Sequence, residues 1–135
     1  MKRILLIDDN ECYIKISKLV LSRILENASV EIVAFTNPKD GLEYILSEYE
    51  LAPVETTVFT DINMPVLNGW DVLNFLDRLP VAIKKYFNVY VLSSSIDPCD
   101  KRKALTNPMV KAYLEKPLSN HVDITKHDLQ QRHYA

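Results

Sequence analysis

Acidic residues follow two apolar runs of the sequence, each at a point where a β-strand would end. Asp8-Asp9 come directly after Ile4–Ile7, and Asp61 comes directly after Val58-Phe59-Thr60. Because the carboxyl ends of parallel strands meet along one edge of a sheet, we expect the three carboxylates to lie side by side. Carboxylates at such short range repel one another, and a small hard cation such as Mg²⁺ relieves the repulsion. The pattern therefore predicts a magnesium site at this edge.

Two later strand-like runs would bring a lysine and a set of hydroxyls to the same edge. Val110–Leu114 leads into Glu115-Lys116-Pro117, and Asn88–Leu92 leads into Ser93-Ser94-Ser95. An ammonium and a hydroxyl beside clustered carboxylates are groups that position a phosphoryl group and stabilise its charge. Carboxylates, lysine and hydroxyls together predict a site for phosphoryl transfer.

Over about Lys2 to Leu118, the chain resembles the receiver domain of two-component response regulators. The residues that carry the resemblance are Asp8-Asp9, Asp61 with Met64-Pro65 and Gly69, Ser93, and Lys116-Pro117. The resemblance implies a switch controlled by phosphorylation, which catalyses only its own phosphorylation and dephosphorylation and is not a turnover enzyme. The phosphoryl group would come from a sensor histidine kinase or a histidine phosphotransfer protein. The signal would leave through protein–protein contacts or onward phosphoryl relay.

The same resemblance assigns a role to each residue of the acidic cluster. Asp61 is the expected phosphoryl acceptor. Asp9 and Asp61 are the expected direct ligands of Mg²⁺, and the main-chain carbonyl of Asn63 is a third ligand. Asp8 would act on the metal through a coordinated water. Lys116 would meet the negative oxygens of the phosphoryl group, turned inward by the cis peptide that the family places before the following proline.

Residues around the cluster match the signalling positions of the family. Ser93 would hydrogen-bond the phosphoryl group, and Tyr113 is the expected switch aromatic. Asn63 and Ser95 match two positions that set how long the phosphoryl bond lasts. Ser94 matches a position where a small side chain leaves access to the site. Taken singly, most of these residues have an ordinary structural interpretation, so the combination carries the prediction.

Apolar runs alternate with helical patterns along the chain, which is typical of βα units around a parallel sheet. The predicted strands are Arg3–Asp8, Val30–Phe35, Thr56–Thr60, Asn88–Leu92 and Val110–Leu114. The predicted helices are Cys12–Leu25, one that starts at Asn37-Pro38, one that starts near Gly69, Pro98–Thr106 and Ser119–Arg132; residues 81–87 are a further helical turn or a loop. The predicted fold is a doubly wound, flavodoxin-like (βα)5 sheet with strand order 2-1-3-4-5. Its ligand crevice would lie between strands one and three.

Helical periodicity predicts the face of each helix that packs against the sheet. These positions are Ile16, Leu19, Val20 and Ile24 in the first helix, Leu42, Ile45, Leu46 and Tyr49 in the second, and Val72, Leu73, Leu76 and Leu79 in the third. Trp70 is interpreted as a packing residue. The apolar positions of the last predicted helix form only a poor stripe.

Length and composition are those of one globular domain, which we expect to span residues 1–135 as a stand-alone receiver. The net charge of −2 indicates no basic surface for nucleic acid, and no apolar run approaches the ~20 residues of a membrane span. We therefore expect a cytoplasmic protein without direct contacts to nucleic acid or membrane. Cys12 and Cys99 lack the spacing of metal ligands and are expected to be reduced thiols. The histidines, six residues apart, are expected to face solvent.

Three other functions fit part of the pattern. A haloacid-dehalogenase-like phosphatase also forms a phosphoaspartate, but its second aspartate, the general acid and base, would fall at Asn63. An EF-hand that began at Asp61 would need a glutamate where Val72 stands. A receiver-like binding module that is not phosphorylated is the third alternative. It is disfavoured because every residue type of the site is present.

Overall fold

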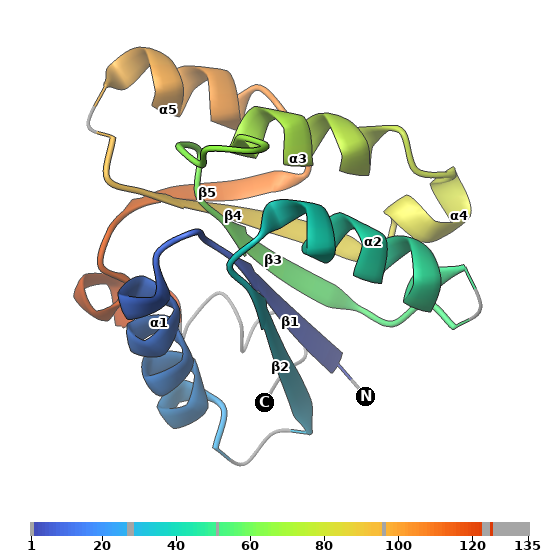
Figure 1. The fold of residues 1–135 in the computed structure, drawn as a ribbon, viewed down its shortest axis with the longest axis horizontal. Coiled ribbons are helices and arrows are strands. Elements are labelled where there is room, and N and C mark those ends of the chain that lie inside the picture. Colours follow the sequence, from blue (N-terminus) through green and yellow to red (C-terminus); the bar gives the residue numbers. More distant parts are fainter. Residues whose placement is uncertain (1, 27–28, 51, 96, 123–124, 126–135) are drawn as a thin grey trace.

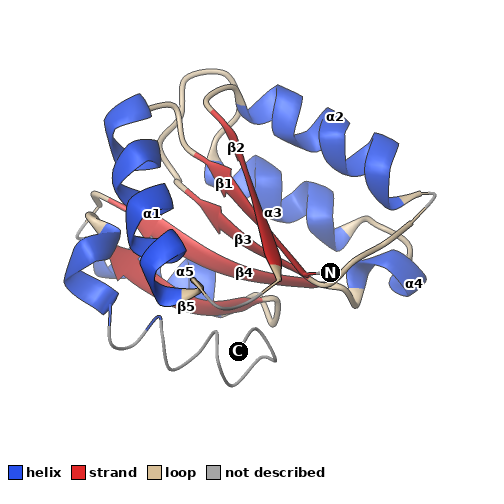
Figure 2. Ribbon diagram, turned by 90° about the horizontal axis from the view of Figure 1, so that it is seen from below, coloured by secondary structure: helices blue, strands red, loops and turns tan. Residues whose placement is uncertain are grey.

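A parallel sheet of five strands runs through the molecule (Figures 1 and 2). The computed structural model describes residues 2–26, 29–50, 52–95, 97–122 and 125. The strands are β1 (Lys2–Ile7), β2 (Val30–Phe35), β3 (Thr56–Thr60), β4 (Phe87–Ser93) and β5 (Val110–Glu115). Their order is β2-β1-β3-β4-β5, and every neighbouring pair is parallel. The predicted doubly wound sheet and its strand order are therefore confirmed.

Helices cover both faces of this sheet. They are α1 (Glu11–Ile24), α2 (Pro38–Tyr49), α3 (Gly69–Asp77), α4 (Val81–Lys84), α5 (Pro98–Leu105) and a short 3-10 helix, η1 (Leu118–His121). In Figure 1, α1 and η1 lie on one face of the sheet, and α2, α3 and α5 lie on the other. No helix in the described part of the chain is long and apolar enough to cross a membrane.

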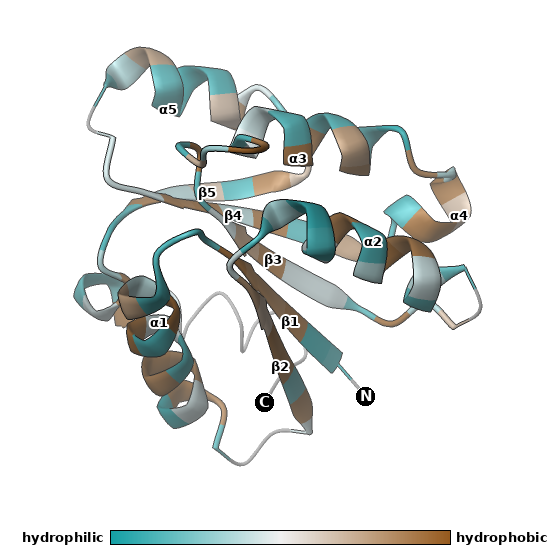
Figure 3. Ribbon diagram, in the orientation of Figure 1, coloured by the Kyte–Doolittle hydropathy of each residue, from teal (hydrophilic) through white to brown (hydrophobic). Residues whose placement is uncertain are grey.

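Alternate residues of the strands build a separate core on each face of the sheet. Ile4 and Leu6 of β1 pack on the α1 side, beside Leu21, whereas Leu5 and Ile7 pack on the side of α2 and α3. Figure 3 shows the resulting hydrophobic strand centres. Burial on both faces explains why residues 4–7 of β1 and residues 89–92 of β4 are continuous apolar runs with no polar alternation.

Asparagine side chains define where three helices begin. Asn10 accepts hydrogen bonds from the main-chain N–H groups of Cys12 and Tyr13, and Asn37 accepts one from Lys39. Asn68 begins α3 through a reciprocal pair of hydrogen bonds with Asp71. The predicted start of a helix at Asn37-Pro38 is therefore confirmed, with Asn37 as its N-cap. Because α1 starts shortly after the end of β1, Asp8 and Asp9 lie between the strand and the helix.

The packing face of α1 differs from the predicted stripe. Ile14, Ser17 and Leu21 are buried, whereas Leu19, which was expected to pack, is 56% exposed. The remaining predicted positions, Ile16, Val20 and Ile24, are only half-buried. Apolar residues occur on more than one face of α1, so periodicity alone does not choose between stripes. The stripe that packs contains the polar residue Ser17, so it is not recognised as an apolar face in the sequence.

The predicted packing face of α2 is also partly wrong, because Leu46 was expected to pack but is 53% exposed. The buried positions of α2 are Pro38, Gly41, Ile45 and Tyr49. Gly41 lies against β1, where a Cβ atom would stand 3.1 Å from Cδ1 of Ile7. Because glycine adds no apolar signal to the pattern, the predicted stripe runs through Leu46 instead.

Two further helices end or begin differently from the predictions. α3 packs through Val72, Leu73 and Leu76 as expected, but it ends at Asp77, so Leu79 lies in the following turn. Residues 81–84 form a helical turn, which is one of the two predicted alternatives.

Near the C-terminus, Leu118–His121 form a 3-10 helix, and residues 123–124 and 126–132 of the predicted last helix lie outside the described residues.

Among the described residues, no cysteine or histidine belongs to the cluster of Asp8, Asp9 and Asp61. Cys12 and Cys99 are free and exposed, as predicted. His121 is half-buried and lines a surface pocket, with Nε2 2.6 Å from the main-chain oxygen of Glu115, so its side chain is partly exposed to solvent. His127 and His133 lie outside the described residues.

Candidate functional site

The carboxyl ends of β1 and β3 bring the three predicted carboxylates together. Ile7 and Thr60 are register partners, so the residues that follow them, Asp8 and Asp61, are neighbours. The main-chain N–H of Asp61 donates to the carbonyl oxygen of Ile7 at 3.1 Å, which ties the two strand ends. Carboxylate oxygens of Asp8, Asp9 and Asp61 lie within 4.8 Å of one another. Asp8 and Asp61 are buried, and the exposed Asp9 opens the cluster to solvent.

Both carboxylate oxygens of Asp61 are held by hydrogen bonds. Oδ1 accepts from the main-chain N–H groups of Ile62 and Asn63, at 2.7 and 3.3 Å. Oδ2 accepts from Nζ of Lys116 at 2.8 Å. These donors orient the carboxylate and place a positive charge beside it.

Lys116 links the ends of β1, β3 and β4. Its Nζ lies 2.7 Å from Oδ2 of Asp8 and 2.8 Å from Oδ2 of Asp61, and its side chain is 3% exposed. Its main-chain N–H donates to the carbonyl oxygen of Ser93 at 2.9 Å. The Lys116–Pro117 peptide is cis, as the resemblance implied. The lysine is therefore a buried part of the cluster and not a surface lysine.

Burial and ion pairing act in opposite directions on the charges of the cluster. Burial alone would lower the pKa of the Lys116 ammonium, but the hydrogen bonds to Asp61 and Asp8 outweigh it, so this pKa is raised. Burial also raises the pKa of Asp8, although Lys116 and the N–H of Asn10 act against that shift. One ammonium therefore faces three carboxylates, and the cluster has a surplus of negative charge.

This donor set fits a hard divalent cation. Carboxylate oxygens from three residues converge, and oxygen is the ligand atom that Mg²⁺ and Mn²⁺ prefer. The surplus negative charge of the cluster favours cation binding.

An aromatic ring also contacts the Lys116 ammonium. Nζ of Lys116 stands 4.2 Å from the ring centroid of Tyr13, in the first turn of α1. Tyr13 is not among the site residues predicted from the sequence. The only signal was its place just behind Asp8-Asp9 in the chain, which by itself does not indicate a contact with a residue after β5.

The loop after Asp61 is shaped by a glycine and anchored by a methionine. The N–H of Gly69 donates to the carbonyl oxygen of Ile62 at 2.8 Å. A Cβ atom at position 69 would lie 2.8 Å from Cα of Ile62 and 3.0 Å from the carbonyl carbon of Asp61. Met64 is buried in the core on the α2 and α3 side. Only glycine allows this close approach, so Gly69 maintains the path of the chain around Asp61.

Ser93 ends β4 at the same edge of the sheet. Thr60 and Val91 are register partners, so Ser93 lies beyond the point where β3 ends. Its side chain is fully buried, and its Oγ accepts from the N–H of Ser95 at 3.1 Å. The adjoining Ser94 is exposed, as is Asn63 on the other side of the site.

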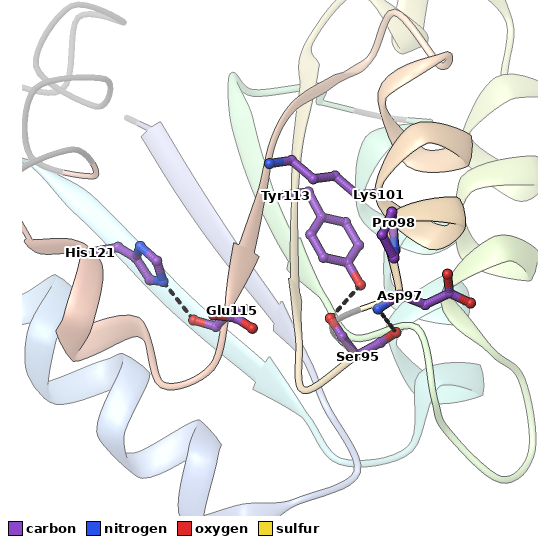
Figure 4. A pocket seen from close by; sticks show the side chains of 7 residues that line it. All are labelled: Ser95, Asp97, Pro98, Lys101, Tyr113, Glu115 and His121. Atoms are coloured by element: carbon purple, nitrogen blue, oxygen red, sulfur yellow. Dashed lines mark hydrogen bonds between the residues drawn. The ribbon is translucent and has the colours of Figure 1, made fainter.

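Tyr113 and Ser95 meet beside a pocket between β5 and α5 (Figure 4). The Tyr113 hydroxyl donates to the main-chain oxygen of Ser95 at 3.0 Å, and its ring is half-buried. Ser95 Oγ donates to a carboxylate oxygen of Asp100 in α5 at 2.7 Å. The loop that follows Ser93 is thus connected both to Tyr113 and to the first turn of α5.

Trp70 packs against the core as predicted, and the ammonium of Lys103 lies 4.3 Å from its ring centroid. This contact joins α3 to α5 and lies outside the acidic cluster.

The family model of the response regulator receiver domain matches residues 4–127. The chain belongs to this family. A receiver domain is a signalling switch controlled by phosphorylation, which is not a conventional enzyme, and no comparison favours the phosphatase or the unphosphorylated binding module.

Similar proteins include the sensory/regulatory protein RpfC of Xanthomonas campestris pv. campestris, which is 29% identical over 117 residues. That match covers 86% of this chain but 15% of RpfC, so the receiver domain spans a small part of its curated relative. A two-component response regulator from Cytophaga hutchinsonii is 25% identical, with a TM-score of 0.79 and 95% of each chain covered. The phosphorylated cyanobacterial phytochrome response regulator RcpA is 27% identical, with a TM-score of 0.71 and 93% and 89% of the chains covered.

Proposed function

We propose that this receiver domain accepts a phosphoryl group on Asp61 in a reaction that depends on Mg²⁺. The observation that carries the proposal is the position of the Asp61 carboxylate, which is oriented by main-chain N–H groups and by Lys116 inside a cluster of oxygen donors. The family supports the same function, and RcpA is described as phosphorylated.

In the proposed reaction, one carboxylate oxygen of Asp61 attacks the phosphorus of a phosphohistidine. The new O–P bond forms as the P–N bond breaks, and the departing imidazole keeps the electron pair and takes a proton from water. The N–H groups of Ile62 and Asn63 hold the carboxylate in position. The Lys116 ammonium moves its hydrogen bond from Asp61 to a phosphoryl oxygen and offsets the charge that collects there.

Asp9 and Asp61 would hold Mg²⁺ directly, together with the main-chain carbonyl of Asn63, and Asp8 would hold it through a water. When bound, Mg²⁺ would supply positive charge that offsets the negative charge of the transferred phosphoryl group.

The direct test is mass spectrometry after incubation with acetyl phosphate and Mg²⁺. We expect one phosphoryl group per chain, lost in alkali or hydroxylamine as an acyl phosphate is. A protein that gains no mass under any Mg²⁺ concentration would refute the proposal.

Replacing Asp9 by Asn should weaken Mg²⁺ binding at least ~10-fold, or about 1.4 kcal/mol, because one direct ligand loses its charge. Titration calorimetry measures the affinity. Glu11→Gln is the matched control, since Glu11 is an exposed acid in the first turn of α1 and outside the cluster. Equal affinity in wild type and Asp9→Asn would exclude Asp9 as a ligand.

We further propose that Ser93 and Tyr113 transmit phosphorylation. Ser93 would turn its hydroxyl toward the phosphoryl group, which frees the N–H of Ser95 and loosens the loop that Tyr113 contacts. The Tyr113 ring would then change its position beside α5. A phosphoryl group shifts this equilibrium only by binding one arrangement better than the other.

Replacing Ser93 by Ala should leave phosphorylation of Asp61 intact but weaken its effect on distant residues, because the hydroxyl that reports the phosphoryl group is gone. Amide hydrogen exchange across residues 97–107 and 110–114, with and without acetyl phosphate, measures the response. Ser94→Ala, which removes an exposed neighbouring hydroxyl, should respond like wild type. A full response in Ser93→Ala would show that another residue carries the signal.

The phosphoryl donor would be a sensor histidine kinase or a histidine phosphotransfer protein, and the output would be a contact with another protein. Three statements remain predictions from the sequence. They are that Asn63 and Ser95 set the phosphoryl lifetime, that a stand-alone domain spans residues 1–135, and that the protein is cytoplasmic.

A further inference from the structure

Three groups in the described part of the chain contact the Lys116 ammonium, and two of these are carboxylates. Asp8 and Asp61 accept its hydrogen bonds at 2.7 and 2.8 Å, and the third contact is the Tyr13 ring, with its centroid 4.2 Å from Nζ. An ammonium has three N–H donors, so the ring covers the side that the carboxylates leave open. We propose that Tyr13 positions the Lys116 ammonium for phosphoryl transfer, an inference that rests on the proposed function.

Tyr13 is held in place by the same segment that holds Asp8. The side chain of Asn10 accepts a hydrogen bond from the N–H of Tyr13 at 3.3 Å, while the N–H of Asn10 donates to Oδ1 of Asp8 at 2.9 Å. One short turn at the start of α1 therefore places both the ring and a carboxylate around Lys116. The ring is half-buried, so its position is defined by this turn and by the contact with the ammonium.

An aromatic face attracts a cation without accepting a full hydrogen bond or adding negative charge. The Lys116 ammonium must exchange its contact with Asp61 for one with a phosphoryl oxygen during the reaction. The ring can keep the ammonium in place during this exchange, because its attraction does not depend on which oxygen the other N–H groups meet. A third carboxylate would hold the ammonium more tightly and oppose the exchange.

A leucine at position 13 would fill similar space but would lack the attraction of the ring for a cation. Without the ring, the ammonium is free to leave the position from which it meets the phosphoryl oxygen in the transition state; a tenfold slower reaction corresponds to about 1.4 kcal/mol, which is within the range of a partly desolvated cation–π contact. We therefore expect Tyr13→Leu to be labelled by acetyl phosphate about tenfold more slowly at saturating donor and Mg²⁺, whereas Tyr13→Phe, which keeps the ring, should stay within about twofold of wild type.

NMR of the protein without metal or phosphodonor gives a readout that is independent of activity. The Cε and Hε signals of Lys116 should be shifted upfield by the ring current in wild type and in Tyr13→Phe, and this shift should be absent in Tyr13→Leu. Ile14→Val is the control for lost packing, since Ile14 is the buried neighbour of Tyr13 in α1. It should lower the stability without changing the labelling rate or the Lys116 signals.

The outcomes separate the two proposals. If wild type takes no label, the proposed function fails and this inference fails with it. If wild type is labelled and Tyr13→Leu matches Tyr13→Phe in rate, or the Lys116 signals are the same in both variants, the role of Tyr13 is refuted while the proposed function stands. If Ile14→Val slows labelling as much as Tyr13→Leu does, the effect of Tyr13 is one of packing and the inference is again refuted.

Discussion

Asp61→Asn should abolish phosphorylation by acetyl phosphate while the fold survives. The asparagine amide keeps the size and shape of the carboxylate but lacks the charged oxygen that attacks phosphorus. It can still accept hydrogen bonds from the N–H groups of Ile62 and Asn63, so the loop after β3 has little reason to move. Mass spectrometry with acetyl phosphate and Mg²⁺ measures the label, and circular dichroism measures the fold.

Asp77→Asn is the matched control for this experiment. It makes the same chemical change at an exposed position that ends α3, outside the cluster of Asp8, Asp9 and Asp61. Labelling of Asp77→Asn should equal that of wild type. An Asp61→Asn protein that still gains an alkali-sensitive phosphoryl group would assign the acceptor to another residue.

Lys116→Met should produce the second large effect, on both rate and stability. Methionine retains most of the apolar stem but removes the ammonium that meets Asp8 and Asp61. Removing one such charge from a developing phosphoryl anion slows transfer by about 100-fold or more. Removing one partner of a buried ion pair costs about 3 kcal/mol or more of unfolding free energy. Phosphorylation kinetics and urea unfolding measure the two effects.

Mg²⁺ and acid should each reverse part of the stability loss in Lys116→Met. Mg²⁺ supplies another positive charge to the carboxylates, so it should stabilise the variant more than it stabilises wild type. Burial already raises the pKa of Asp8 above its unfolded value. The ionised Asp8 carboxylate therefore destabilises the fold at pH values above its folded pKa, and this destabilisation is lost as the pH falls through that pKa. A variant as stable as wild type at neutral pH, or a penalty that grows on acidification, would contradict this account.

The sheet and its acidic edge follow from local features of the sequence. A strand buried on both faces is mostly apolar, so the centres of β1 and β4 are visible as continuous runs. In this fold the carboxyl ends of the strands meet, and that is why the aspartates after β1 and β3 and the lysine after β5 predict a common site from their positions alone. The cap at Asn37 is equally local, because the side chain bonds to a main-chain group two residues away.

The packing faces of the helices required the tertiary structure. Ser17 and Gly41 are buried although neither is apolar enough to mark a packing face, whereas Leu19 and Leu46 are apolar but exposed. The choice depends on the space between helix and sheet, which favours a small residue where the two approach closely. Periodicity in one helix contains no information about that distance.

From the sequence alone it was therefore possible to predict the strand order, the clustered carboxylates and the lysine that joins them. Only the tertiary structure decided what surrounds that lysine. Tyr13 and Lys116 lie near opposite ends of the chain, and neither position alone indicates the other. Their contact arises because the first turn of α1 and the segment after β5 are both held at the carboxyl edge of the sheet. A contact of this kind depends on the relative positions of two loops, which are determined by the packing of the entire sheet.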